Sequence, residues 1–343
     1  MSKSFSVRHH FFSFSTPVRS LWSMLALFVC FLAVIVFSLC LGEEPIILQD
    51  VFWSLLGRAD QGTQFVVETL RLPRVLMAAM VGAALASSGL VLQSMIRNPL
   101  ASPDIIGITG GASAAAVCFL SFFATAIGLV WLPVFAIMGA FLAALLIYGL
   151  AWNSGVTPMR LVLVGIGISS AMGAVTTFVI AASPLSTSIT AYIWLTGSVY
   201  GASWVEVKAL LPWLLVSWPL AFYLARRVNT QELGDQLATG LGISVQRLRL
   251  ALLFLSVIMA APAIAYAGAV GFVGLIAPHI ARRLVARSFA LLLPTSALVG
   301  SCLVMLADLC GRLLFQPLDI PAGVFVSAIG APFFIYLLYR QRF

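Results

Sequence analysis

The stretch LALLFLSVIMAAPAIAYAGAVGFVGLIAPHIARRLVAR, residues 250–287, decides how many times this chain crosses a membrane. It is too long for one span, because about 20 apolar residues cross a hydrocarbon core of about 30 Å. Gly268, Gly271 and Gly274 interrupt its apolar pattern before Pro278. We therefore predict a full span over about 250–267 and a short helix over 271–281. The short helix cannot cross alone at ~1.5 Å per residue, so it must be buried among other helices.

The composition of the whole chain indicates a polytopic membrane protein. Of its 343 residues, 62% are hydrophobic and only 9% are charged, and the mean hydropathy is +1.08. A water-soluble domain of this composition would expose large apolar patches. The fold class is therefore all-α, with about ten membrane elements, some of them short or broken. Besides 250–287, the apolar runs of span length are 21–41, 72–96, 105–127, 129–151, 160–182, 205–225, 289–307 and 321–339.

The placement of charge gives the topology. The net charge is +8, which in a soluble protein would suggest a nucleic-acid partner. With a cytoplasmic N-terminus and alternating spans, fourteen of the nineteen basic residues fall inside and eight of the eleven acidic residues fall outside. This bias obeys the positive-inside rule, so we expect no nucleic-acid partner. Both termini are basic and therefore cytoplasmic, which requires an even number of crossings and agrees with ten.

The domain organisation follows from this topology. We expect a cytoplasmic tail over 1–20 and a single transmembrane domain over 21–340, with a polar cytoplasmic segment at 228–249. Two stretches of the domain have similar spacing: Ala86-Ser87-Ser88-Gly89 with the ten residues to Pro99, and Ala265-Tyr266-Ala267-Gly268 with the ten residues to Pro278. The topology makes them run in opposite directions, as in transporters with an inverted repeat. Chance similarity in a chain rich in Gly and Ala is the alternative.

Sequence motifs for catalysis are absent. No G-x-x-x-x-G-K-[ST] and no H-E-x-x-H occurs, and no two of the five cysteines form a C-x-x-C pair. We expect no catalytic residue, no metal site and no cofactor on this chain. A membrane-embedded enzyme is disfavoured because no base lies beside a serine. An ion-coupled carrier is disfavoured because the central thirds of the predicted spans hold no ionisable side chain.

The polar cytoplasmic segment contains a short helical pattern from Glu232 to Leu241, which ends at Gly242 in the C-cap position. Its apolar residues share one helix face: Leu233, Leu237, Ala238 and Leu241. A helix of this length is marginal in isolation. It gains stability by docking either onto another protein or onto its own membrane domain, and the sequence leaves both possibilities open.

A second polar break is RNPLASPDIIGITGG, residues 97–111, where two prolines precede a Gly-rich return into the apolar pattern. Irregular backbone at membrane depth is tolerated only where protein or a water-filled cavity satisfies it. We therefore expect this stretch either to pack against protein or to line a water-filled cavity.

Three arginines lie at the extracellular ends of predicted spans, against the charge bias. Arg71 and Arg74 begin one span, and Arg312 ends another, four residues after Asp308. For Asp308, an i,i+4 pair with Arg312 is the simple explanation. Snorkelling of the arginine side chains and capture of carboxylates on a partner explain the arginines equally well.

Five ordered stretches carry a resemblance to a known family. They are RLPRVLMAAMVGAALASSG (71–89), RNPLASPDIIGITGGAS (97–113), LGDQLATGLGIS (233–244), GFVGLIAPHIARR (271–283) and ADLCGRLLFQPLDIPAGV (307–324). They are similar to the permease subunits of bacterial ABC importers for ferric siderophores, haem and cobalamin. Through IWLTGSVYGASW (193–204) the chain looks closest to ferric citrate and ferric enterobactin permeases.

The resemblance implies a type II ABC importer permease of ten helices in the bacterial inner membrane, surrounded by membrane lipids. Its implied partners are a second permease subunit, identical or related, and two cytoplasmic ATPase subunits that hold the ATP and Mg. A periplasmic or lipid-anchored substrate-binding protein delivers a ferric-siderophore chelate, with haem or cobalamin as the alternative cargo. ATP-driven alternating access moves this cargo across the membrane.

The resemblance also implies roles for particular residues. Three arginines resemble those that engage glutamates of the binding protein: Arg71, Arg74 and Arg312. The segment that resembles the ATPase-coupling helix contains Glu232, Leu233, Gly234, Asp235, Ala238, Leu241 and Gly242. Asp235 stands where many relatives have glutamate, which leaves the polar pairing at that position open. The stretch that resembles the cytoplasmic gate contains Asn98, Pro99 and Leu100.

Overall fold

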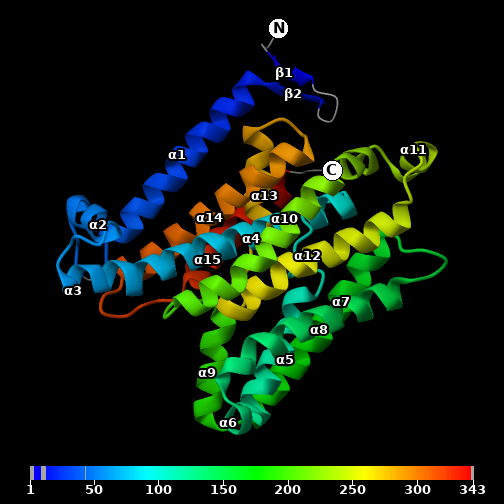
Figure 1. Ribbon diagram of the computed structural model, residues 1–343. Helices are drawn as coiled ribbons and strands as arrows, with labels where there is room; N and C mark the ends of the chain where they lie inside the picture. Colours follow the sequence, from blue (N-terminus) through cyan, green and yellow to red (C-terminus); the bar gives the residue numbers. More distant parts are fainter. Residues whose placement is uncertain (1–3, 9–12, 43, 341–343) are drawn as a thin grey trace.

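The computed structural model describes residues 4–8, 13–42 and 44–340, and these form a bundle of helices (Figure 1). Within them, eight helices are long and apolar enough to cross a membrane. The long helices are α1 (Val18–Cys40), α4 (Leu72–Ile96), α7 (Leu132–Ala151), α8 (Pro158–Ala182), α10 (Trp204–Glu232), α12 (Val245–Ala267), α14 (Phe289–Leu313) and α15 (Ala322–Arg340). With the shorter α5 (Ile108–Phe122) and α13 (Val273–Leu284), they account for all ten predicted elements.

Several short elements connect these helices. They are α2 (Leu48–Leu55), α3 (Gln61–Gln64), a π-helical turn η1 (Phe65–Arg71), α6 (Ala124–Ile127), a 3₁₀ turn η2 (Leu129–Trp131), α9 (Leu185–Thr196) and α11 (Asp235–Gly240). The sequence did not predict α2, α3, η1 or α9. All four are short, and an isolated helix of such length has little propensity of its own.

The N-terminal tail contains a small exception to the all-α fold. Strands β1 (Ser4–Arg8) and β2 (Ser13–Pro17) pair antiparallel, with Ser4 opposite Pro17. The rest of the tail before β2, residues 1–3 and 9–12, lies outside the described residues, as do Glu43 and Arg342.

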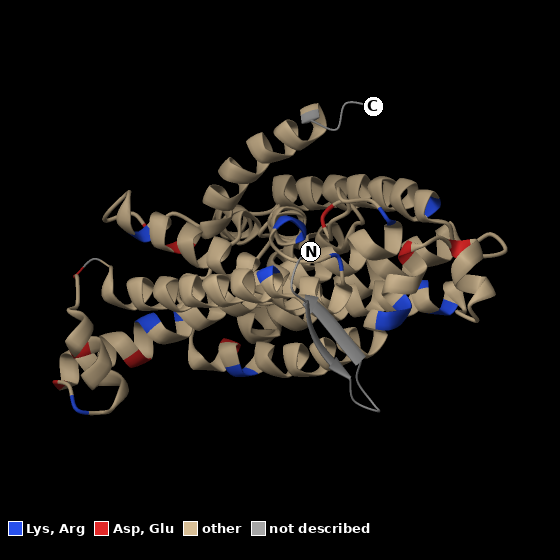
Figure 2. Ribbon diagram, turned by 90° about the horizontal axis from the view of Figure 1, so that it is seen from above, with Lys and Arg blue, Asp and Glu red and all other residues tan. Residues whose placement is uncertain are grey.

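The bundle has two polar ends, and the contacts between elements define them. The α2 end holds α2, α3 and the start of α10, where the Trp204 indole N–H donates to the Glu68 carbonyl at 2.9 Å. The α11 end holds α11 and the end of α4, where Arg97 pairs with Asp235. Figure 2 shows charged residues gathered at the end with α2 and α3 and again at the opposite end. Helix α4 therefore runs the whole way from the α2 end to the α11 end.

The predicted division of residues 250–287 is confirmed. Helix α12 ends at Ala267, and α13 begins at Val273. Gly268 between them has φ +71°, and a Cβ there would lie 2.1 Å from the Trp194 carbonyl oxygen. Only glycine fits this position without displacing backbone. Helix α13 is buried along most of its first two turns, as expected for a helix too short to span.

Helix α4 is the centre of the bundle and packs against α10, α12, α13 and α14 (Figure 1). In its most apolar window 89% of the residues are buried. Close approach depends on glycine: a Cβ on Gly89 would lie 1.9 Å from the Gly274 carbonyl oxygen of α13. Small residues permit such backbone contact between membrane helices.

The two stretches aligned as a possible inverted repeat have different local structures. Gly89 lies inside the continuous helix α4, which ends only at Ile96. Gly268 instead ends α12, and Pro278 lies inside α13. The residues aligned by spacing therefore occupy different positions relative to the helix breaks.

Candidate functional sites at the two ends of the bundle

Arg74 at the α2 end forms a double ion pair inside the protein. Its guanidinium contacts Asp308 of α14 at 2.8 Å and Asp319 at 2.6 Å. Its guanidinium carbon also lies 5.3 Å from the centre of the Tyr200 ring. The Arg74 residue is 9% exposed and Asp308 is 2% exposed. A buried arginine held by two carboxylates is neither snorkelling nor free, so the structure gives it a third role: it joins α4 to α14.

The other two arginines lie beside Arg74 and are also held. Arg71 donates to the backbone carbonyls of Leu39, Cys40 and Glu44 and thereby fixes the end of α1. The Arg312 Nε lies 3.2 Å from Asp308 Oδ2. The predicted i,i+4 pair between Asp308 and Arg312 is thus present, and Arg74 extends it into a network.

These arginines share one hollow of about 560 Å³ at the α2 end. Its lining includes all three arginines, together with Tyr200 and Asp319. The structure therefore brings Arg312 beside Arg71 and Arg74, from which it is separated by more than two hundred positions in the sequence. A partner carboxylate entering this hollow would meet guanidinium groups that already have partners.

The predicted coupling helix begins later than the sequence indicated. Glu232 is the last residue of α10, and Gly234, with φ +117°, prevents the helix from continuing. Helix α11 then runs only from Asp235 to Gly240, with Leu241 as its C-cap and Gly242 at φ +83°. The prediction of one helix from Glu232 to Leu241 was wrong, because the left-handed backbone at Gly234 divides it.

The leucines around α11 face away from the rest of the chain. Leu233 is 63% exposed, Leu237 61% and Leu241 68%. Ala238 is fully buried and faces the membrane domain. Of the four apolar residues predicted to share one helix face, only Ala238 packs on the chain's own membrane domain. Three large apolar side chains remain uncovered at a polar end of the molecule.

The predicted gate stretch directly follows α4. Arg97 caps α4 in the left-handed conformation, with φ +58°. The Asn98 side-chain oxygen accepts the Leu100 backbone N–H at 2.9 Å and so forms a tight turn. Asn98 is exposed, while Pro99 and Leu100 are half-buried. The stretch is a compact turn at the α11 end.

Asp104 is a residue that the sequence interpretation missed. It lies in the return from the gate stretch to α5, where its Oδ1 accepts the Thr109 hydroxyl at 2.7 Å. Its Oδ2 accepts the backbone N–H of Phe272 at 3.4 Å, and Phe272 is the N-cap of α13 with φ +65°. One carboxylate thus joins the breaks before α5 and α13.

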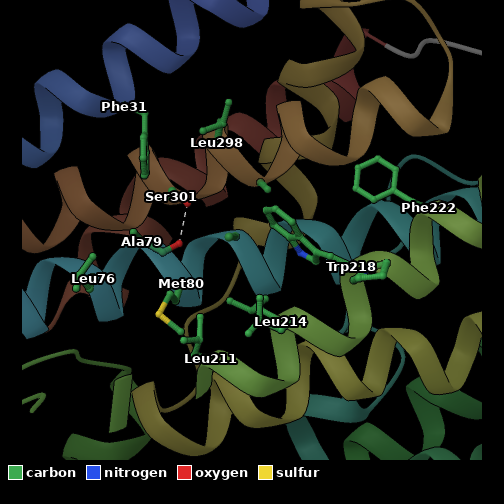
Figure 3. Close-up of a pocket in the computed structure, with 14 residues that line it drawn as sticks. Phe31, Leu76, Ala79, Met80, Leu211, Leu214, Trp218, Phe222, Leu298 and Ser301 are labelled. Atoms are coloured by element: carbon green, nitrogen blue, oxygen red, sulfur yellow. Dashed lines mark hydrogen bonds between the residues drawn. The ribbon is translucent and has the colours of Figure 1, made fainter. Parts of the chain in front are cut away.

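A second hollow, of about 580 Å³, lies between α1, α4, α10 and α14 (Figure 3). Its lining is apolar apart from the Ser301 hydroxyl, which donates to the Ala79 carbonyl at 2.7 Å, and the Trp218 indole nitrogen. Phe31, Leu76, Met80 and Leu214 point into it in Figure 3. This hollow offers almost no polar groups for a charged or hydroxyl-rich molecule.

No group of three or more potential metal-binding side chains comes together within the part of the chain that the structure describes. The prediction that this chain carries no metal and no cofactor of its own stays a prediction.

Comparison with known proteins gives a consistent result. The FecCD transport family matches residues 30–340. The achromobactin transport system permease protein CbrC of Dickeya dadantii (strain 3937) is 58% identical over 91% of this chain and 89% of its own length. The Fe(3+) dicitrate transport system permease protein FecD of Escherichia coli (strain K12) is 38% identical over 89% of this chain and 94% of its own length. The similarity to CbrC thus exceeds the similarity to the ferric citrate permease.

A solved structure agrees with the fold. It is described as a metal-chelate type ABC transporter in an inward-facing conformation. It superposes with a TM-score of 0.83 at 30% identity and covers 93% of this chain and 99% of its own chain.

Proposed function

Since the chain belongs to the FecCD transport family, we propose that it forms a membrane passage driven from its α11 end by separate ATPase subunits. The chain is a permease of an ABC importer for siderophores and related iron chelates. It is a transport subunit, and the chemical work of ATP hydrolysis, with its ATP and Mg, belongs to its partners.

The observation that carries the proposed drive is the uncovered face of α11. Leu233, Leu237 and Leu241 are each more than 60% exposed, at an end of the bundle that also holds many charged residues. Exposed apolar side chains grouped in this way mark a protein contact. A groove on each ATPase subunit is the partner that suits a short helix with one apolar face.

We infer that the α2 end receives the substrate-binding protein in the periplasm. This end holds the hollow lined by Arg71, Arg74 and Arg312. Because these guanidiniums already have partners in the chain, docking would proceed by sharing or exchange of hydrogen bonds rather than by capture of free charges. The positive-inside bias supports the matching orientation, with the α11 end and both termini in the cytoplasm of a bacterial inner membrane.

We infer that two permease subunits pair around the passage. In the most apolar window of α8 only 22% of the residues are buried, and in that of α15 only 28%. These helices have surface available for membrane lipids and for a second permease, identical or related. The passage would then form between two subunits, so neither hollow within this chain has to hold the cargo.

The proposed cargo is a ferric siderophore of the achromobactin class. CbrC, which shares 58% identity with this chain, is named as an achromobactin transport permease, and this identity is well above the 38% of FecD. These relatives do not favour haem or cobalamin.

An uptake panel tests the cargo. Cells that lack this gene receive it on a plasmid, and iron uptake is measured with radioactive iron bound to achromobactin, citrate or enterobactin. Cobalamin and haem serve as controls in separate uptake measurements. We expect the gene to restore uptake from achromobactin most strongly. If the gene restored uptake of haem or cobalamin but of no ferric siderophore, the proposed cargo would be refuted.

A further inference from the structure

Asp235, the first residue of α11, connects the exposed leucine face to the interior of the membrane domain. Its carboxylate contacts two arginines from different helices. Oδ2 lies 2.5 Å from Nη2 of Arg249 in α12, and Oδ1 lies 3.4 Å from Nη2 of Arg97 at the end of α4. A six-residue helix with one small buried anchor, Ala238, depends on such contacts for a defined position.

The two contacts differ in strength. The Arg249 side chain is 2% exposed, and among the described residues Asp235 is the one carboxylate that forms an ion pair with it. Removing the partner of a buried charge is strongly unfavourable, so this pair persists. The Arg97 side chain is 35% exposed and that of Asp235 is 38% exposed. Ion pairs between exposed groups are weak and can form and break readily.

The strong contact also reaches a third element. Nη1 of Arg249 donates to the Val156 carbonyl at 2.7 Å. Val156 is fully buried in the connection between α7 and α8, and its N–H donates to the Gln246 side chain of α12 at 2.9 Å. Asp235, Arg249 and Val156 therefore hold α11, α12 and the connection between α7 and α8 together as one unit.

The weak contact reaches the gate stretch. Arg97 directly precedes Asn98, and its left-handed backbone, with φ +58°, ends α4. A non-glycine residue in this conformation is costly and persists only when its surroundings hold it. The pair with Asp235 is one restraint on Arg97 that depends on the position of α11.

We propose that Asp235 is a positioning residue for transport, which stays on Arg249 and makes or releases Arg97 as α11 moves. The inference rests on the proposed function, because it assumes that ATPase subunits displace α11. Movement of α11 then moves α12 and the connection between α7 and α8 through Arg249. It acts on the gate stretch at 98–100 through the reversible pair with Arg97. Asp235 thereby links the ATPase contact to the gate by an ion pair within this chain.

The test measures ATP hydrolysed per iron delivered, the coupling ratio. The complete complex of permease subunits, ATPases and binding protein is reconstituted in liposomes, with iron-loaded achromobactin carrying radioactive iron as the probe. Arg97→Gln removes only the weak contact. We expect it to raise the coupling ratio by about two- to fivefold, the range that an exposed ion pair supports, and to leave the melting temperature of the complex unchanged. Arg97→Lys should recover part of the coupling.

Arg247→Gln is the matched control, because Arg247 is an exposed arginine in the first turn of α12, two residues before Arg249. We expect its coupling ratio to equal that of the wild type. In an Asp235→Asn background, Arg97→Gln should have no additional effect on the ratio, since the pair is already broken. A coupling ratio for Arg97→Gln equal to that of Arg247→Gln would overturn the inference, and so would the same fold-change in both backgrounds. Failure of the wild-type complex to hydrolyse ATP or deliver iron would instead refute the proposed function.

Discussion

Replacing Arg74 by glutamine tests whether the arginines at the α2 end hold the bundle together. The substitution removes the guanidinium that joins α4 to Asp308 and Asp319. Asp308, which is 2% exposed, would keep only its 3.2 Å contact with Arg312. The change therefore leaves a buried carboxylate with one partner instead of two.

The magnitude follows from burial. Removing one partner of a buried ion pair costs about 3–5 kcal/mol. Because Arg312 remains and the Asp319 side chain is 26% exposed, we expect the lower end, about 3 kcal/mol. Arg74→Lys keeps the charge but loses the forked geometry, so its loss should be smaller. Arg74→Glu would place a third carboxylate beside Asp308 and Asp319 and should be the least stable of the three.

The assay is thermal unfolding of the purified protein in detergent, combined with affinity for the binding protein at low and high salt. Arg58→Gln is the matched control, because Arg58 lies at the same end but is exposed, stacking on Trp53 at 5.8 Å. We expect Arg74→Gln to lower the melting temperature by several degrees and Arg58→Gln to leave it unchanged. If Arg74→Gln had the same melting temperature as Arg58→Gln and lost only salt-sensitive binding of the binding protein, Arg74 would be a free docking residue. The ion pairs around Asp308 would then have no structural role.

Three further substitutions test the ATPase contact, the close helix crossing and the gate stretch. Leu237→Asp should abolish co-purification with the ATPase subunits while the permease stays folded, whereas Gln236→Asp on the same helix should not; equal co-purification would exclude α11 as the contact. Gly89→Val should destabilise the bundle by about 1–3 kcal/mol or more in thermal unfolding, because the new side chain would meet the Gly274 carbonyl. Gly173→Val is the control and should be neutral, because no atom lies within 4 Å of a Cβ at that position. Equal melting temperatures of the two variants would contradict the close crossing of α4 and α13. Asn98→Leu removes the bond to the Leu100 N–H and should increase leakage of iron-loaded achromobactin from loaded liposomes without ATP; wild-type leakage would argue against a gate here.

The sequence predicted the membrane elements well because their signals are local. Apolar length marks each span, and the glycines before Pro278 mark the break that separates α12 from α13. The same reasoning misplaced the start of the coupling helix. Helix periodicity continues through residues 232–241, whereas the left-handed conformation of Gly234 depends on its neighbours in space.

The ion pairs could not be predicted, because they join distant parts of the chain. Arg74 and Asp308 are 234 positions apart, and no periodicity relates them. The i,i+4 partner Arg312 was visible in the sequence, but it is only one of two arginines on Asp308. Asp104 was overlooked for a related reason: it precedes a span in the sequence, and only the fold brings it against the N-cap of α13.

The central claim is that this chain is a passage moved by ATPase subunits at its α11 end. Its most direct test is iron delivery into liposomes containing the permease subunits and binding protein, with wild-type ATPase subunits, with hydrolysis-deficient ones, or with none. We expect iron-loaded achromobactin to accumulate only with wild-type ATPase subunits and ATP, and we expect this accumulation to be unaffected by collapse of ion gradients. Accumulation without any ATPase subunit, lost when the ion gradient is removed, would contradict it.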